Sequence, residues 1–264
     1  MKITVFTSNR PRHINLIKKL AGIADTVYAV QECATVFPGQ VKDFFNNSPV
    51  MQDYFRRVIQ AEENIFGKVS FLPENVKSLS LKLGDLNLLP LDTLSEALQS
   101  DYYVVFGSSF IKGDLIRFLV EQRAINIHMG VSPYFRGSSC NFWAPYMGMP
   151  ELVGATVHLL SEKLDAGDML YHALPEPQEI EPFDLGMRAV EVAHNSLVVR
   201  IRTGEIREYE PIPQDATKEI RYTRNAEFND EVASNYLNNL WVPKQIRQKL
   251  EERDLSMLLR PYIK

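Results

Sequence analysis

The sequence predicts an α/β protein built on an open, mostly parallel, Rossmann-like sheet flanked by helices. Strand-like and helix-like segments alternate over the first two-thirds of the chain, which is the pattern of an α/β sheet. One run, at 102–107, is apolar throughout, as in a strand covered on both faces. A chain of 264 residues, 45% hydrophobic and 23% charged, has the composition of a globular protein and can bury one large core.

The first segments predict a strand, a polar loop and a helix, followed by a second strand. Residues 2–7 are β-branched and aromatic, 8–13 are polar, and 14–21 have apolar residues at helical spacing. Residues 25–31 form the next strand-like run. A right-handed crossover would make the two strands parallel.

The middle of the chain predicts further helices and strands. Residues 39–67 are helix-compatible and predict a packing helix, 75–89 a strand and turn, and 92–98 a short helix. The apolar strand at 102–107 ends in glycine, and 112–122 predicts the helix that follows it. The apolar stripe of the 39–67 segment consists of Phe44, Phe45, Met51, Tyr54, Phe55, Val58 and Ile59.

The last third changes character. Strands are predicted at 154–160 and 169–174, and a helix at 185–201. Beyond it the chain is punctuated by prolines and contains short helical pieces. We therefore expect one domain over residues 1–210 and a linker with a short, mainly helical C-terminal extension over 211–264. The apolar side chains of this extension would pack within the chain or form a homodimer surface. They are Tyr236, Leu237, Leu240 and Trp241.

Charge and cysteine content narrow the classes of partner and compartment. The net charge of -4, with its cations distributed along the chain, gives no electrostatic footprint for nucleic acid. The two cysteines, Cys33 and Cys140, lie far apart, which fits a reducing compartment. We find no signal-peptide pattern and no run long enough to span a bilayer. These features predict a cytoplasmic protein that does not act on membranes.

Two polar side chains on one strand suggest a site. Asn126 and His128 are two residues apart at the end of an apolar run, so they project to the same face. Polar clusters at 8–13, 107–110 and 126–136 all follow predicted strands. In an open α/β sheet such clusters meet outside the carboxyl ends of the strands.

The side chains of Asn126, His128 and Asp165 suit acyl transfer if the fold brings them together. An amide can stabilise a developing oxyanion, and an imidazole and a carboxylate can move protons. The acceptor would be an amine or water. Ser138, Ser139 and Cys140 offer a covalent alternative, although their Gly-Ser-Ser turn more often caps a helix.

At these residues the sequence resembles the folate-dependent formyltransferase family. The resemblance rests on Asn126-Ile-His128 followed by Pro133 and Gly137, and then on Leu164-Asp165-Ala-Gly167. This family includes glycinamide ribonucleotide formyltransferase, the catalytic domain of methionyl-tRNA formyltransferase and the sugar N-formyltransferases. The likeness extends to a Ser-Asn loop after the first strand, the segment 107–111 and a late element at 213–224.

The resemblance implies transfer of a formyl group from 10-formyltetrahydrofolate to an amine, with no metal. It implies three catalytic residues: Asn126, His128 and Asp165. It implies that the folate contacts Ser109, Phe110, Ile111, Leu160, Ser161, Glu162, Lys163 and Leu164. For the acceptor we expect Ser8, Asn9, Arg10, Arg12, Ser132, Arg136 and Gly137.

Two departures from the family pattern bear on the acceptor. Met129-Gly-Val-Ser stands where the family often has Pro-Ser-Leu-Leu, and the residues after 226 have too little strand pattern for the β-barrel domain of the tRNA branch. We therefore expect a small acceptor, an amino sugar linked to a nucleotide. The alternatives are a hydrolase that releases formate, formylation of glycinamide ribonucleotide or methionyl-tRNA, and a non-catalytic folate-binding module.

Several residues have a plainer alternative. Arg10, Arg12 and His13 precede a helix and would either bind an acceptor phosphate or form a solvated loop. Arg136 would contact a phosphate or brace its turn. For His158 and His172 we expect packing or surface roles. The aromatic residues of 142–146 are expected in the core, and Cys140 is expected to be buried. Asp168 is expected to support the turn that carries Asp165.

Overall fold

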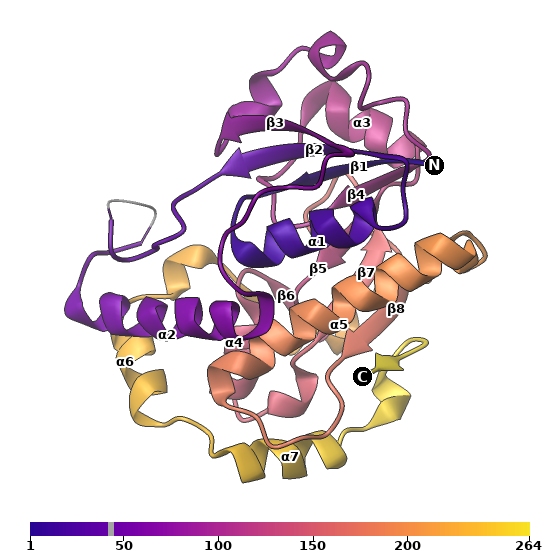
Figure 1. Ribbon diagram of the computed structural model, residues 1–264. Helices are drawn as coiled ribbons and strands as arrows, with labels where there is room; N and C mark the ends of the chain where they lie inside the picture. The colour runs from indigo at the N-terminus through magenta and orange to yellow at the C-terminus, as the bar shows by residue number, and fades with distance from the viewer. Residues whose placement is uncertain (42–44) are drawn as a thin grey trace.

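The computed structural model describes residues 1–41 and 45–264, and it is an α/β fold around an eight-stranded sheet (Figure 1). The strand order is β10-β8-β7-β5-β4-β1-β2-β3. A separate two-stranded ribbon joins β6 and β9. The strands are β1 (Lys2–Thr7), β2 (Thr26–Cys33), β3 (Val76–Lys82), β4 (Tyr102–Val105), β5 (Ile125–His128), β6 (Phe135–Gly137), β7 (Ala155–Leu159), β8 (Met169–Leu174), β9 (Arg221–Thr223) and β10 (Tyr262–Ile263).

The sheet is mostly parallel, which confirms the predicted fold class. All pairs from β3 to β5 are parallel, and β10 is parallel to β8. Only β7 runs against both of its neighbours. The chain builds outward from β1 to β3 and then returns to the other side of β1 with β4. The strand order therefore reverses between β1 and β4, which is where ligands bind in open α/β sheets.

Helices cover both faces of the sheet. The main helices are α1 (Pro11–Ala21), α2 (Pro49–Phe66), α3 (Gly113–Glu121), α4 (Cys140–Tyr146), α5 (Pro182–Thr203), α6 (Asp230–Asn238) and α7 (Pro243–Glu251). On one face, Val5 and Val104 pack with Leu16 of α1 and Leu197 of α5. On the other face, the adjacent strand residues pack against α3. Each strand supplies both cores because its successive side chains point to opposite faces.

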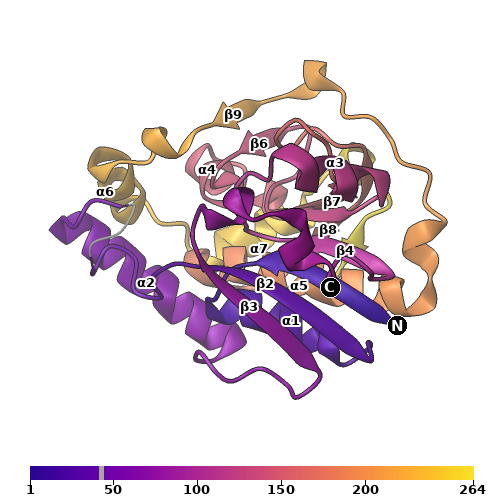
Figure 2. The same ribbon diagram turned by 90° about the horizontal axis from the view of Figure 1, so that it is seen from above.

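The C-terminal segment packs on the rest of the chain. Figure 2 shows β9 beside β6 and α6 beside α2. Tyr236 of α6 and Leu250 of α7 share a core with Tyr54 of α2 and Trp143 of α4. The strand β10 extends the main sheet along β8. Tyr236, Leu237, Leu240 and Trp241, the four apolar residues noted in the sequence, therefore pack against this core within the chain.

The structure shortens two predicted elements. Within 39–67 the helix begins only at Pro49, because Ser48 caps it by accepting the Met51 N–H and proline suits the first helical turn. Phe44, part of the predicted stripe, lies outside the described residues. The predicted helix at 92–98 is a 3-10 turn at Leu91–Leu94. None of the helices in the described ranges is long and apolar enough to cross a membrane.

Candidate functional site

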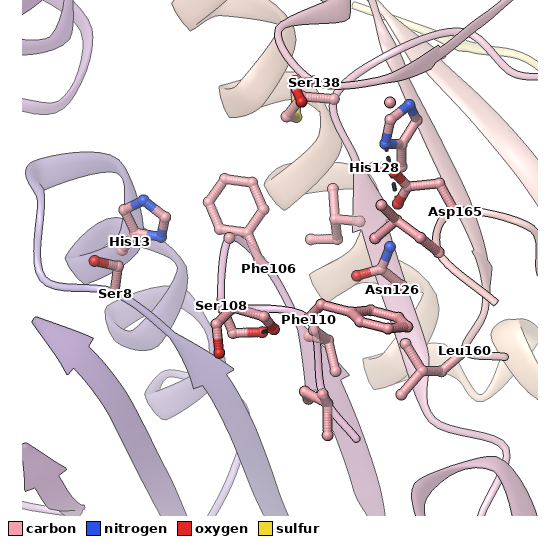
Figure 3. Close-up of a pocket in the computed structure, with 18 of the residues that line it drawn as sticks. Ser8, His13, Phe106, Ser108, Phe110, Asn126, His128, Ser138, Leu160 and Asp165 are labelled. Carbon is pink, nitrogen blue, oxygen red and sulfur yellow. Dashed lines mark hydrogen bonds and ion pairs between the residues drawn. The ribbon is translucent and has the colours of Figure 1, made fainter. Parts of the chain in front are cut away.

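A cavity of about 540 Å³ lies outside the carboxyl ends of β1, β4 and β5. All three polar clusters predicted from the sequence contribute to its wall, through Ser8, Gly107 and His128 among others. Figure 3 shows Asn126, His128 and Asp165 together on one side of this cavity, with Ser8 and His13 across from them. A volume of this size suits a small organic ligand.

His128 and Asp165 form a buried pair. Nδ1 of His128 lies 3.4 Å from Oδ1 of Asp165 (Figure 3). Asp165 reaches this position because its loop turns sharply, with Asp165 itself at a φ of 47°. The loop also passes so close to β7 that a Cβ at Gly167 would lie 1.7 Å from the Leu159 carbonyl oxygen. This contact explains why the Leu-Asp-x-Gly motif ends in glycine.

The other side of the His128 ring faces two further acceptors. Nε2 lies 3.4 Å from the Phe135 carbonyl oxygen and 3.5 Å from Sγ of Cys140, which is buried. Burial lowers the pKa of His128, but the Cys140 sulfur and the Asp165 carboxylate outweigh burial and raise it well above 6.5. Burial would raise the pKa of Asp165, yet His128 beside it keeps that pKa below 3.8 on balance. Both shifts favour the ion pair of an imidazolium and a carboxylate over the neutral pair.

Asn126 is oriented by His158. The two residues lie opposite each other in the antiparallel pairing of β5 and β7, so their side chains share a face. Nδ1 of His158 donates to the Leu159 carbonyl at 2.7 Å, so Nε2 has no hydrogen and accepts from the Asn126 amide at 2.9 Å. Burial lowers the pKa of His158 to about 4, which keeps the ring neutral. The second amide hydrogen of Asn126 and its oxygen remain for the cavity.

The loop after β4 forms the aromatic wall of the cavity. Ser109, Phe110 and Ile111 all line it, and Phe110 is 40% exposed. A fully buried carboxylate, Glu32, holds this loop: it accepts the Ser109 N–H at 2.6 Å, the Ser109 hydroxyl at 2.9 Å and the Gly84 N–H at 2.8 Å. The loop is held from a second side by Asn87, whose amide donates to the Phe110 carbonyl at 2.9 Å, so Glu32 at the end of β2 and Asn87 together position the wall.

The loop between β7 and β8 forms the neighbouring wall. Four of its five predicted residues line the cavity, namely Leu160, Ser161, Lys163 and Leu164. Glu162 is exposed and is not part of the lining. The Leu160 N–H donates to the Ala124 carbonyl at 2.7 Å, which fixes the start of this loop beside β5.

The loop after β1 supplies three of its four predicted residues. Ser8, Arg10 and Arg12 line the cavity. Asn9 instead turns away and exchanges hydrogen bonds with the backbone of Ala34 at 3.0 Å. Its role is to tie the β1 loop to the segment after β2, a contact that the sequence does not reveal because the two loops are far apart along the chain.

The segment after β5 contributes less than expected. Ser132 is fully buried, donates its N–H to Thr156 and does not line the cavity. Arg136 also lies off the wall and pairs with Glu219 at 3.1 Å. Gly137 does line the cavity, and a Cβ there would lie 2.1 Å from the Thr223 carbonyl oxygen of β9.

A second cavity of about 640 Å³ adjoins the first. The two share Phe45 and Asn225 as wall residues. The second cavity lies between α2 and α6, and no Lys or Arg occurs among the described residues that line it. Its remaining wall residues are Asn46, Met51, Ala226, Phe228, Asn229, Asp230 and Glu231.

Sequence reasoning did not predict His158 as a neighbour of Asn126 or Glu32 as the anchor of the aromatic loop. Both roles follow from strand pairing, which the sequence pattern does not specify. The alternation of residues along 154–160 put His158 in a strand, but its partner strand was needed to place it beside Asn126. His13, which also lines the cavity, was expected with Arg10 and Arg12 either to bind an acceptor phosphate or to form a solvated loop, but it is buried rather than solvated.

Comparison with known proteins gives a consistent result. The sequence model of the family described as Formyl transferase matches residues 86–201. The methionyl-tRNA formyltransferase of Synechococcus sp. (strain JA-2-3B'a(2-13)) is 30% identical over 124 residues, which are 47% of this chain and 38% of that protein. The chain thus matches well under half the length of this curated relative.

Two solved structures have a similar fold. A 4-N formyltransferase from Francisella tularensis superposes with a TM-score of 0.53 at 16% identity, over 93% of this chain and 85% of that one. The N-formyltransferase from Helicobacter canadensis, in complex with folinic acid and dTDP-3-aminofucose, gives a TM-score of 0.52 at 12% identity, over 87% and 73%. The family match includes Asn126, His128 and Asp165, and the fold likeness extends over most of the chain. Residues 86–201 thus match the formyltransferase family model, and the chain is similar to formyltransferases in sequence over this region and in fold over most of its length.

Proposed function

We propose that this protein transfers a formyl group from 10-formyltetrahydrofolate to the primary amine of a small acceptor, an amino sugar linked to a nucleotide. The observation that carries the proposal is the convergence of Asn126, His128 and Asp165 on one side of the cavity, next to the aromatic wall at Phe110. Residues 1–210 would form the catalytic domain, and 211–264 an extension packed against it.

Each of the three residues has a role that its geometry suits. The free amide hydrogen of Asn126 and the imidazolium of His128 would stabilise the negative charge that develops on the formyl oxygen as the amine attacks. The carboxylate of Asp165 holds His128 in place and would accept the proton that the amine loses. As the new C–N bond forms, the bond between the formyl carbon and N10 of the donor would break, and the proton taken up by Asp165 would pass to N10. The products would be the neutral N-formyl amine and tetrahydrofolate.

The residues present fit a formyl-folate donor. An exposed aromatic ring at Phe110 offers a stacking surface, and the backbone of 160–164 offers polar groups along the adjacent wall. When bound there, the donor would supply the formyl carbon beside Asn126 and His128. Lys163 lies on the same wall, where its charge would favour an anionic tail.

The second cavity supports an acceptor larger than a simple amine. Because it shares Phe45 and Asn225 with the first cavity, a ligand with its amine at His128 can extend between α2 and α6. Phe228 and the amide of Asn229 line this extension and would suit a flat, hydrogen-bonding base. The similar Helicobacter canadensis enzyme was solved with a nucleotide-linked amino sugar.

The charge of this surface favours a small acceptor over tRNA. Asp230 and Glu231 flank the second cavity, and none of the described residues that line it is cationic. A polyanion gains its affinity from lysine and arginine contacts to phosphate, which the described wall of this second cavity does not offer. The curated relatives are methionyl-tRNA formyltransferases, so methionyl-tRNA is one of the acceptors in the test below.

The test is an incubation of the full chain with 10-formyltetrahydrofolate and separate acceptors: dTDP-3-aminofucose, glycinamide ribonucleotide, methionyl-tRNA and water alone. We expect an N-formyl sugar product by mass spectrometry. The product should be lost in His128→Ala and retained in Asn239→Ala, which alters an amide at the end of α6 outside both cavities. Formate release at a rate that no amine changes would indicate a hydrolase. Folate binding without any turnover would indicate a binding module.

A further inference from the structure

His13 is a buried histidine at the start of α1 that the proposed chemistry does not use. Its side chain is 4% exposed and borders the main cavity. Figure 3 places it with Ser8 on the side of the cavity opposite His128, away from Phe110 and Leu160, the residues that would contact the folate. A polar ring so deeply buried beside a cavity is expected to have a defined hydrogen-bonding role.

The hydrogen bonds of Thr7 fix the tautomer of His13. The Thr7 hydroxyl lies 2.7 Å from the Phe106 carbonyl oxygen, which can only accept, so the single hydroxyl hydrogen is directed there. The same hydroxyl oxygen lies 2.8 Å from Nδ1 of His13. Nδ1 must therefore carry the hydrogen and donate it to Thr7. In the neutral ring the other nitrogen, Nε2, is then a bare acceptor.

The bare nitrogen of His13 has no protein partner among the described residues. His194 provides a contrast, since its Nε2 is sealed inside the protein without a partner. Nε2 of His13 is not sealed in this way, and its ring borders the cavity. The acceptor on His13 is therefore available to a ligand.

The ring of His13 is held rigidly in this orientation. It packs on Phe106, with 4.8 Å between ring centroids. A Cβ at Gly107 would lie 2.5 Å from Cε1 of His13, so only glycine leaves room for the ring. Gly107 also has a φ of +66°, which favours glycine. A hydrogen-bonding group fixed in this way discriminates between ligands better than a mobile one.

The backbone N–H groups at the start of α1 are not available to a phosphate near His13. The first residue of α1 is Pro11, which has no N–H, and the Arg12 N–H donates to the carboxylate of Glu62 at 3.1 Å. The Arg12 guanidinium also pairs with Glu62, at 2.9 Å. The backbone N–H of His13 donates to the Arg10 carbonyl. The donors that a helix N-terminus offers to an anion are thus already satisfied. Burial, followed by Arg12 and Arg10, keeps the pKa of His13 well below 6.5, so the ring adds no positive charge.

We propose that His13 determines acceptor specificity: its Nε2 accepts a hydrogen bond from a neutral donor, a hydroxyl or amide N–H, on the acceptor molecule. The assignment of this ligand as the acceptor rests on the proposed formyl transfer, because the folate wall lies on the other side of the cavity. A sugar ring, which has hydroxyl groups beside its amine, provides such a donor. An acceptor with a phosphate or ether oxygen at that position would face a lone pair and be rejected.

Two variants separate hydrogen bonding from packing. His13→Phe retains a ring against Phe106 but has no acceptor, whereas Thr7→Val leaves the ring in place and removes the partner of Nδ1. With dTDP-3-aminofucose we expect His13→Phe to lower kcat/KM by about 10- to 100-fold, the effect of one lost hydrogen bond in a buried site. The KM for 10-formyltetrahydrofolate should stay unchanged. A set of dTDP-3-aminofucose analogues, each lacking one sugar hydroxyl, identifies the donor. With the analogue that lacks the hydroxyl bound by His13, wild type and His13→Phe should be equally slow.

A measurement without turnover tests the same assignment. In protein labelled with 15N-histidine, the Nε2 signal of free His13 should have the chemical shift of an unprotonated nitrogen and should move towards lower frequency when dTDP-3-aminofucose binds. Inorganic phosphate should leave it unchanged. In Thr7→Val both tautomers should be seen.

The outcomes separate the two proposals. If wild type formylates no acceptor, the proposed function fails, and the 15N shift still decides whether Nε2 is a bare acceptor. If wild type is active but His13→Phe is equally fast with dTDP-3-aminofucose and every deoxy analogue, the specificity role is overturned. A protonated Nε2 in the free protein overturns it as well.

Discussion

The amide nitrogen of Asn126 lies 2.9 Å from Nε2 of His158, and this contact decides which way the amide faces. The two residues occupy opposite positions in the β5–β7 pairing. Because His158 donates through Nδ1 to the Leu159 carbonyl, it can only accept from Asn126. A neutral histidine in the neighbouring strand therefore orients the amide that would stabilise the oxyanion.

The first prediction concerns this contact. His158→Phe keeps a buried ring but removes the acceptor, so the Asn126 amide loses its fixed orientation. We expect kcat to fall by about 10- to 100-fold, less than the 10²- to 10³-fold loss expected when Asn126→Ala removes the donor itself. Steady-state kinetics of both variants check this order. The double variant should be no slower than Asn126→Ala, and additive losses would contradict the mechanism.

The second prediction concerns pH. The proposed imidazolium of His128 loses its proton only above the ordinary value of 6.5, because its pKa is raised. The Asp165 carboxylate takes up a proton only below 3.8, because its pKa is lowered. The kcat/KM profile should therefore be flat through neutral pH, falling on the alkaline side as His128 deprotonates and on the acid side as Asp165 is protonated.

Asp165→Asn provides the control for this profile. It removes a negative charge that raises the pKa of His128, so the alkaline limb should move to lower pH. The rate should fall by about 10²- to 10⁴-fold, the range for loss of general acid–base assistance. An alkaline limb at the same pH in wild type and variant would show that His128 does not set it.

The third prediction concerns the aromatic wall. Glu32→Ala leaves the N–H groups of Ser109 and Gly84 without their acceptor, at a cost of about 1–3 kcal/mol for each buried donor that stays unpaired. The loop that carries Phe110 should shift, and the KM for 10-formyltetrahydrofolate should rise by about 10- to 100-fold. Glu121→Gln, at an exposed carboxylate in the last turn of α3, is the matched control and should match wild type. An unchanged folate KM in Glu32→Ala would separate this loop from folate binding.

The fourth prediction compares two glycines by urea unfolding. Gly167→Ala places a Cβ against the Leu159 carbonyl, so the loop must shift and the free energy of unfolding should fall by more than about 1 kcal/mol. The shift should also reduce activity, because Asp165 lies in the same loop. Gly186 in α5 has open space around its Cβ position, and Gly186→Ala should raise the free energy of unfolding by about 0.5–1 kcal/mol. Equal stabilities would disprove this account of the motif.

Much of the fold could be predicted because its strands are long or strongly apolar. The run at 102–107 and the alternating segments before it gave the parallel sheet and its helices. The antiparallel direction of β7 could not be predicted, since periodicity along a strand carries no information about its neighbour. The strands β9 and β10, of three and two residues, are too short for any periodicity to register.

Some of the site residues could also be predicted from the sequence, and others could not. The spacing of Asn126 and His128 placed both on one strand face, and both line the cavity. The resemblance of the Leu-Asp-x-Gly motif predicted Asp165 as a third catalytic residue, and the structure places it beside His128. Ser132 and Arg136 stood in the same polar cluster, yet strand pairing and the C-terminal segment turn them into internal contacts.

The sequence by itself determined the α/β class, the position of the polar clusters at strand ends and the chemical groups available there, because these depend on residue type and local period. The tertiary structure alone decided that His158 orients Asn126, that Glu32 holds the aromatic wall, and that His13 presents a bare nitrogen to the cavity. These depend on which hydrogen bonds are formed between distant segments. The donor or acceptor role of a histidine nitrogen is set by its partner, and only the folded chain supplies the partner.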